Sequence, residues 1–236
     1  MSKPAATSPF HAGERTIQTR AGVAARADLL GRRVIRDHLT GQHREFFATL
    51  PFVFLAAVDQ RGRPWASPVF GRPGFVTTPT ARRLHVQAPL LAGDPLNDAL
   101  RRGANVGVLG IDYASRRRNR VSARVRAVAA GLELDVVQTF GNCPQYIQAR
   151  AATRLPANDA SRAQHMAVTI AALSDRDREL ITRSDSFMIA SHHAGPADSP
   201  SAGAGTQLSY GSLPGSGRHA RPTSQVTNHM PCAGPQ

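Results

Sequence analysis

Residues 51–71 read PFVFLAAVDQRGRPWASPVFG, and this stretch predicts a β-hairpin. Residues 52–59 form a short, continuous apolar run of the kind found in a buried strand, and residues 64–71 form a second strand. Between them, Gln60-Arg61-Gly62 has the composition of a turn. Pro51 ends the helix predicted before the hairpin, because proline cannot continue the interior of a helix.

Further strands are predicted downstream of this hairpin. Residues 83–88 and 104–112 carry short apolar strand patterns, and residues 118–128 alternate strictly between apolar and polar positions. Residues 132–136 alternate in the same way, and residues 187–190 begin another strand. Because these strands follow one another with little helix between them, the sequence excludes a doubly wound parallel sheet. It favours a mainly β fold, a small antiparallel barrel with peripheral helices.

Helices are predicted mainly before the hairpin. Residues 1–26 are polar with weak periodicity and are expected to form an N-terminal arm. Apolar side chains recur at helical spacing in residues 29–39, and residues 41–50 predict a second helix. Asp94-Pro95 has the form of an N-cap followed by proline at the first helical position, with Gly103 closing that helix.

The composition changes abruptly near the C-terminus. Ser174 and Asp177 resemble a capping box for a helix that ends near Arg183. After residue 191, 25 of the 45 residues in 192–236 are Gly, Pro, Ser or Ala. Such a segment buries too little apolar surface to offset about 1–2 kcal/mol of backbone entropy per ordered residue. We therefore expect a folded body at residues 27–191 and a disordered low-complexity tail at 192–236.

The charge of the chain is strongly basic. Its 29 Lys and Arg residues stand against 16 Asp and Glu residues, giving a net charge of +13. Such an excess is typical of partners of nucleic acid or of anionic membranes. Lys3 is the single lysine, and the other 28 basic residues are arginine. So uneven a usage is interpreted as a codon bias rather than as selection for phosphate contacts.

Several classes of protein are excluded by what the sequence lacks. No apolar run approaches the roughly 20 residues of a membrane-spanning helix, and the first twenty residues show no secretory signal. Cys143 and Cys232 are too far apart in sequence to suggest a disulfide framework or a metal site. No glycine-rich nucleotide loop follows a predicted strand. These observations predict a cytoplasmic protein with no membrane partner and no metal.

Five segments share an order and a spacing with one known family. They are residues 51–68, Gly93-Asp94-Pro95-Leu96, and residues 106–112, 116–121 and 141–147. Together they resemble the pyridoxamine 5′-phosphate oxidase-like, FMN-binding split-barrel proteins, over about residues 11–191. The resemblance implies an antiparallel split β-barrel that binds FMN at a homodimer interface. It also implies an oxidoreductase with an unknown small-molecule substrate, in which the flavin supplies the redox chemistry and the protein orients it.

The resemblance implies a set of cofactor-binding residues but no catalytic residue. Ser67 stands where the family usually places a phosphate-binding arginine, so its hydroxyl donates a hydrogen bond but supplies no charge. Asp94 lies where the family carries a lysine motif; it is interpreted either as a group that repels phosphate or as a helix N-cap. Nearby arginines are the candidates for the missing cation. The implied cofactor-binding residues are Ser67, Pro68 and Val69 under the flavin, Gln87 and Ala88 along its ring, and Arg117, Arg118 and Arg120 at the phosphate.

Two other interpretations stay open. The chain is a truncated, non-catalytic fragment of the family if the break near residue 191 reflects a truncation or a shifted reading frame. Alternatively it is a basic barrel that binds nucleic acid through the arginines of residues 116–126, with Tyr113 and Trp65 stacking on bases. Nucleic acid is the less favoured partner, because only these two aromatic residues are placed to stack.

Overall fold

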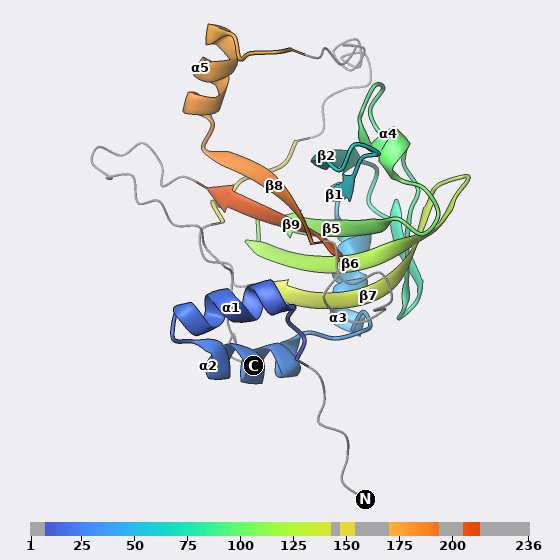
Figure 1. The fold of residues 1–236 in the computed structure, drawn as a ribbon. Helices are drawn as coiled ribbons and strands as arrows, with labels where there is room; N and C mark the ends of the chain where they lie inside the picture. The colour runs from blue at the N-terminus through green and yellow to red at the C-terminus, as the bar shows by residue number, and fades with distance from the viewer. Residues whose placement is uncertain (1–7, 143–146, 154–169, 194–204, 213–236) are drawn as a thin grey trace, which may run out of the picture.

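The predicted hairpin is the first pair of a seven-stranded antiparallel sheet (Figure 1). The computed structural model describes residues 8–142, 147–153, 170–193 and 205–212. Strand order across the sheet is β2-β1-β5-β6-β7-β4-β3, and every pairing is antiparallel. The strands are β1 (Phe52–Val58), β2 (Pro64–Phe70), β3 (Val76–Thr80), β4 (Arg83–Val86), β5 (Asn105–Asp112), β6 (Arg117–Val128) and β7 (Leu132–Asn142).

The sheet curls around one apolar core, and its two edges stay apart. Inward-facing side chains from all seven strands join one cluster of buried residues. Strands β2 and β3 form the two edges, and in the described part of the chain they do not pair with each other. The sheet is therefore a barrel with a split, which confirms the predicted mainly β, split-barrel fold.

Helix α3 (Gly41–Thr49) packs on this core as the sequence predicts. The side chain of Thr40 caps it by accepting a hydrogen bond from the His43 backbone N–H, and Pro51 follows its end. Phe47, which is fully buried, lies against the backbone of β5. A Cβ at Gly110 would come 2.7 Å from the Phe47 ring, so a glycine is required for this close approach.

One helix lies in the region predicted to be an arm, and a second begins at the end of that region. Helix α1 (Ala12–Arg20) begins with a capping box in which His11 Nδ1 accepts from the backbone N–H of Glu14, and Glu14 accepts from that of His11. The sequence prediction missed it because histidine is not among the usual N-cap residues. The sequence predicts a helix over residues 29–39, but helix α2 spans Ala24–Val34. It ends early because backbone hydrogen bonds between Arg36 and Thr139 hold the next segment extended against β7.

The later helices begin near their predicted caps. Asp94 Oδ1 accepts the backbone N–H of Leu96 at 2.8 Å just before α4 (Leu96–Ala99), but the N-cap position is held by Pro95 rather than by Asp94. The helix also ends at Ala99, well before the predicted Gly103, because Leu100 leaves the helical conformation. Ser174 and Asp177 form the predicted capping box of α5 (Asp175–Arg183). No residue of α5 is buried, so its cap rather than tertiary packing holds its first turn.

A second hairpin begins inside the predicted folded body and continues past its predicted end at residue 191. Strand β8 (Ser186–His193) pairs with β9 (Gly205–Ser212), which falls inside residues 192–236, predicted to be disordered. Composition averaged over that segment could not reveal β9, because its backbone hydrogen bonds depend on β8. Figure 1 shows the hairpin crossing the outer face of the sheet, where Met188 and Ala190 pack near Ala56 and Ile111.

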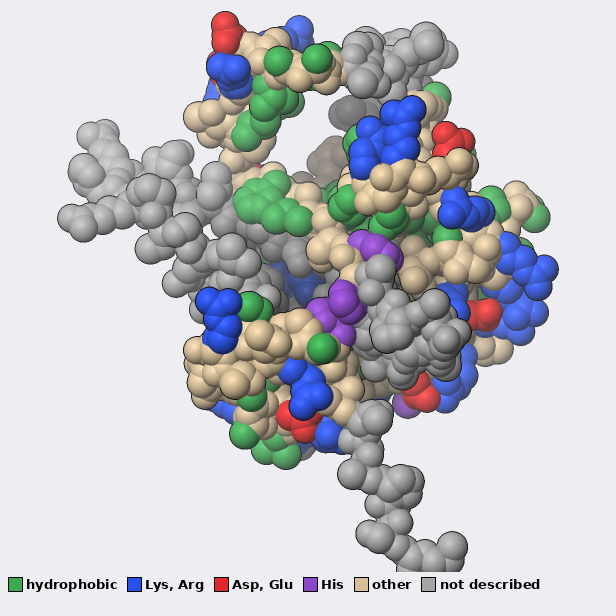
Figure 2. Space-filling model, in the orientation of Figure 1, with side chains coloured by type: hydrophobic (Ala, Val, Ile, Leu, Met, Phe, Trp, Pro, Cys, Tyr) green, Lys and Arg blue, Asp and Glu red, His purple; other side chains and the backbone are tan. Residues whose placement is uncertain are grey.

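The residue that caps α1 contacts the same hairpin. The rings of His11 and His193 stack with their centroids 4.0 Å apart, and Figure 2 shows histidine side chains next to one another at the middle of this face. The described helices are all too short or too polar to cross a membrane.

Candidate functional site

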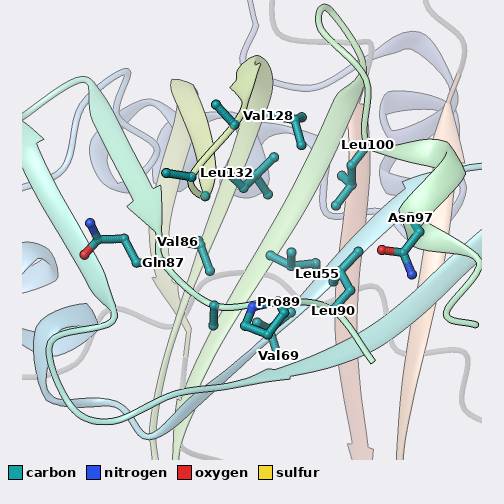
Figure 3. A pocket seen from close by; sticks show the side chains of 14 residues that line it. Leu55, Val69, Val86, Gln87, Pro89, Leu90, Asn97, Leu100, Val128 and Leu132 are labelled. Atoms are coloured by element: carbon teal, nitrogen blue, oxygen red, sulfur yellow. The ribbon is translucent and has the colours of Figure 1, made fainter. Parts of the chain in front are cut away.

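A cavity of about 470 Å³ opens where several loops meet one end of the curled sheet (Figure 3). Its inner wall comes from Leu55 of β1 and Val69 of β2. The segment after β4, helix α4 and the turn between β6 and β7 form the other walls. The lining residues are Leu55, Val69, Val86, Gln87, Ala88, Pro89, Leu90, Asn97, Leu100, Val128, Ala129, Ala130, Gly131 and Leu132.

The cavity is walled by apolar side chains, with two amides at its rim. The side chain of Asn97 donates to the carbonyl oxygens of Leu91 and Asp94, at 3.2 and 3.0 Å, and so fixes the loop before α4. Gln87 is exposed, and its amide points away from the apolar cluster in Figure 3. A pocket of this size with apolar walls and few polar groups is typical of a small-molecule site.

The turn between β6 and β7 closes tightly against β4. A Cβ at Gly131 would lie 2.9 Å from the Val86 carbonyl oxygen and 2.9 Å from His85 Nε2. A glycine is therefore needed for this wall to meet β4. Sequence reasoning missed the turn, Asn97 and Leu100 as parts of the site, because nothing local marks them and only the folding of the sheet brings them together.

The buried Ser67 is hydrogen-bonded to the half-buried Asp94. Ser67, only 5% exposed, is the register partner of Leu55 on β1 and shares a strand face with Val69. Its hydroxyl donates to Asp94 Oδ1 at 2.8 Å, and the same oxygen accepts the backbone N–H of Leu96. The Ser67 proton is therefore directed at a carboxylate of this chain.

The other implied residues of β2 and β4 divide between the two faces of the sheet. Val69 and Ala88 line the cavity, as does Gln87. Pro68 lies between Ser67 and Val69 in sequence and so points to the opposite face, where its register partner is Phe54. The structure thus brings four of the five residues implied near the flavin to one cavity or its immediate wall.

The implied phosphate-binding arginines lie at the far end of β6. Arg117 begins the strand and Val128 ends it at the cavity, so Arg118 lies about 33 Å from Val128 along the strand at ~3.3 Å per residue. Arg118 and Arg120 are 3% and 6% exposed, and burial, together with the charge of Arg118, lowers the pKa of Arg120 to about 9. Arg117 is exposed, with its guanidinium 5.1 Å from the centroid of the Phe46 ring. Within this chain, the structure does not bring these arginines to the cavity.

The arginines of residues 116–126 do not form one exposed basic surface. Two of them are buried, and Arg126 lies 3.8 Å from a Glu133 oxygen and 3.7 Å from an Asp135 oxygen. Trp65, one of the two expected stacking residues, donates its indole N–H to Asp59 at 3.0 Å and is partly buried against the core. The Trp65 hydrogen bond, with those from Arg63 and Arg61, lowers the pKa of Asp59.

Metal ligation is not indicated among the described residues, which contain no group of three or more His, Cys, Asp or Glu side chains placed to hold an ion. Cys143 lies outside the described residues.

Comparisons with known proteins give weak likenesses. No family model and no curated protein matches the chain. Among solved structures, it is similar to a Lactobacillus delbrueckii protein assigned as a pyridoxamine 5′-phosphate oxidase, with 20% identity over 44% of this chain and 95% of that one, at a TM-score of 0.35. It is also similar to an F420 reductase (12% identity, 45% and 100% covered, TM-score 0.31). A third match is an FAD and heme binding protein from Mycobacterium smegmatis (12% identity, 60% and 91% covered, TM-score 0.30). The fold described above rests on the chain's own strand pairing and not on these matches.

Proposed function

We propose that this protein binds a flavin, with the isoalloxazine ring in the cavity between β2, β4 and α4. The observation that carries the proposal is the cavity itself, whose volume and apolar walls suit a flat aromatic ring system. The sequence resemblance implies the same ligand class independently, through Val69, Gln87 and Ala88, all of which line this cavity.

The described residues fit the ring of FMN better than its phosphate. Leu55, Val69 and Leu100 offer apolar cover, and the exposed Gln87 lies at the rim. A phosphate needs charge-assisted hydrogen bonds, and the described lining side chains include no Arg or Lys. In its finer form, the proposal is that the flavin is FMN, that the protein forms a homodimer, and that it acts as an oxidoreductase on an unknown substrate. A bound flavin would supply the redox chemistry, while the chain orients its ring and shields it from water.

Titration of the purified chain with flavins tests the proposal. We expect quenching of flavin fluorescence and a shifted visible absorbance, both saturating with protein concentration. Ala88→Trp, which fills the half-buried rim of the cavity, should weaken binding at least about tenfold, equivalent to roughly 1.4 kcal/mol. Ala114→Trp, in the exposed turn between β5 and β6, is the matched control and should bind as the wild type does. Saturable binding that Ala88→Trp leaves unchanged would mean that the flavin binds outside this cavity.

A further inference from the structure

Exposed apolar side chains gather in one segment of the chain. In the part of the chain that the structure describes, eleven large hydrophobic residues are exposed, and six of them lie between positions 170 and 189. Figure 2 shows hydrophobic side chains over α5 and over the adjoining end of β8 on one face of the molecule. The six residues are Ile170, Leu173, Leu180, Ile181, Phe187 and Ile189. Single exposed apolar residues are ordinary, but such a cluster is typical of a surface that a partner covers.

Strand β8 is apolar on both of its faces at this end. Met188 and Ala190 pack against the cluster that contains the buried Ala56. Phe187 and Ile189 point the other way, because successive side chains of a strand alternate, and they are 43% and 50% exposed. A strand with one face in water normally carries polar side chains on that face. The outer face of β8 therefore has the composition of a buried surface.

Helix α5 is too short to be stable through its own backbone hydrogen bonds. It has nine residues, and isolated helices shorter than about 12–15 residues are marginal in water. Most of the stability of a helix in a protein comes from packing of its apolar face. Leu180 and Ile181 form that face in α5, yet they are 68% and 58% exposed, and Figure 1 shows the helix standing away from the sheet. Like β8, α5 presents an apolar face that calls for a partner.

The charges on α5 favour a second copy of the same helix as that partner. Two copies of a chain with a net charge of +13 repel each other except where the local charge is balanced. Helix α5 is balanced, with three acidic residues and three arginines. Asp177 lies in its first turn, three positions before Leu180, and Arg183 lies in its last turn, three positions after, so these residues share one side. In an antiparallel pair, the acidic first turn of each copy would face the basic last turn of the other.

We propose that α5 and the outer face of β8 form an interface between two copies of this chain, related by a two-fold axis near Leu180. A two-fold interface uses the same patch on both copies, so a patch that complements itself is sufficient. Helix α2 does not meet this condition: it exposes Leu29, but its three arginines and one aspartate give it a net charge of +2. The inference does not depend on flavin binding, and it assigns a surface to the homodimer proposed above.

Sedimentation velocity of the full-length protein tests the interface. From about 1 to about 100 μM, the mass should rise from that of a monomer towards that of a dimer. Leu180→Glu places two carboxylates together near the axis, so it should raise the dimer dissociation constant at least about tenfold. Arg183→Glu brings acidic groups opposite one another and should weaken the dimer in the same direction. Both side chains are exposed, so both variants should keep the circular dichroism spectrum of the wild-type monomer.

Leu29→Glu is the matched control, because it makes the same change at a leucine that is 72% exposed on another helix. It should leave the dissociation constant as in the wild type. A protein that stays monomeric at every concentration would refute both the interface and the homodimer, but would leave flavin binding untouched. A dimer that Leu180→Glu and Arg183→Glu do not weaken would use another surface, and equal effects of Leu180→Glu and Leu29→Glu would exclude a specific role for α5.

Discussion

Acidification from pH 7.5 to pH 4 is expected to destabilise the fold through one buried histidine. His43 on α3 is 7% exposed, and its Nδ1 lies 3.1 Å from the Thr139 hydroxyl of β7. Burial, and after it the nearby charges of Arg36, Arg117 and His38, together lower the pKa of His43 from 6.5 to about 4. The folded state therefore holds this imidazole neutral.

The direction and size of the effect follow from proton linkage. Between pH 6.5 and about pH 4 the unfolded chain binds a proton at His43 that the folded chain does not, so the free energy of unfolding falls as the pH falls. The stabilisation is complete above pH 6.5 and is lost progressively towards pH 4. At about 1.36 kcal/mol per pKa unit, and discounted for the remaining exposure, the loss amounts to about 2–3 kcal/mol. That is a substantial part of the roughly 5–15 kcal/mol that stabilises a typical domain.

Urea denaturation at a series of pH values measures this slope. His43→Asn, which has no titrating group, should flatten the dependence between pH 6.5 and pH 4. Thr139→Val is the matched control: it removes the hydroxyl but leaves His43 buried, so it should lower stability at every pH and keep the slope. His192, whose pKa burial also lowers, contributes in the same direction, and His192→Asn measures its share.

The carboxylates of Asp28 and Asp37 do not account for this dependence of stability on pH. The pKa values of Asp28 and Asp37 are lowered below 3.8 by hydrogen bonds, to Arg32 and to His38 respectively, so the stability they provide is lost only at more acidic pH. A wild-type stability that stays constant from pH 6.5 to pH 4.5, or a His43→Asn variant with the wild-type slope, would refute the reasoning.

Three further changes test the fold locally. Gly110→Ala should lower the free energy of unfolding in urea by about 1–3 kcal/mol, because its Cβ would lie 2.7 Å from the Phe47 ring. Gly41→Ala is the control: its Cβ meets nothing within 4 Å, so it should be neutral or slightly stabilising. Equal effects of the two variants would contradict the packing of Phe47 on β5. Asp59→Asn should change the fluorescence of Trp65, the single tryptophan, because it weakens the acceptor of the indole N–H, and an unchanged spectrum would argue against that bond. Ser174→Ala should speed hydrogen exchange in α5 about fivefold, from the loss of roughly 1 kcal/mol of capping, with the melting temperature unchanged.

Local patterns in the sequence were sufficient for most elements of the fold. The hairpin of β1 and β2, the limits of α3 and the capping box of α5 all depend on residues close together in the chain, and the structure confirms them. Two of the exceptions have local causes of their own, whereas β9 was missed because its pairing depends on β8. Helix α1 is capped by His11, an unusual residue for that position, and β3 is a short, threonine-rich edge strand that no apolar pattern marks.

The sequence by itself determined that this chain forms antiparallel strands with apolar and polar faces, because alternation along a strand is a local property. Only the tertiary structure decided which side chains share the cavity and where the charges lie. Leu55, Asn97 and Gly131 meet there because the sheet curls. Arg118 lies at the end of β6 away from the cavity, because an extended strand keeps its two ends far apart in space. The link between Asp94 and β2 was likewise decided by packing, since its hydrogen bond to Ser67 joins residues 27 positions apart.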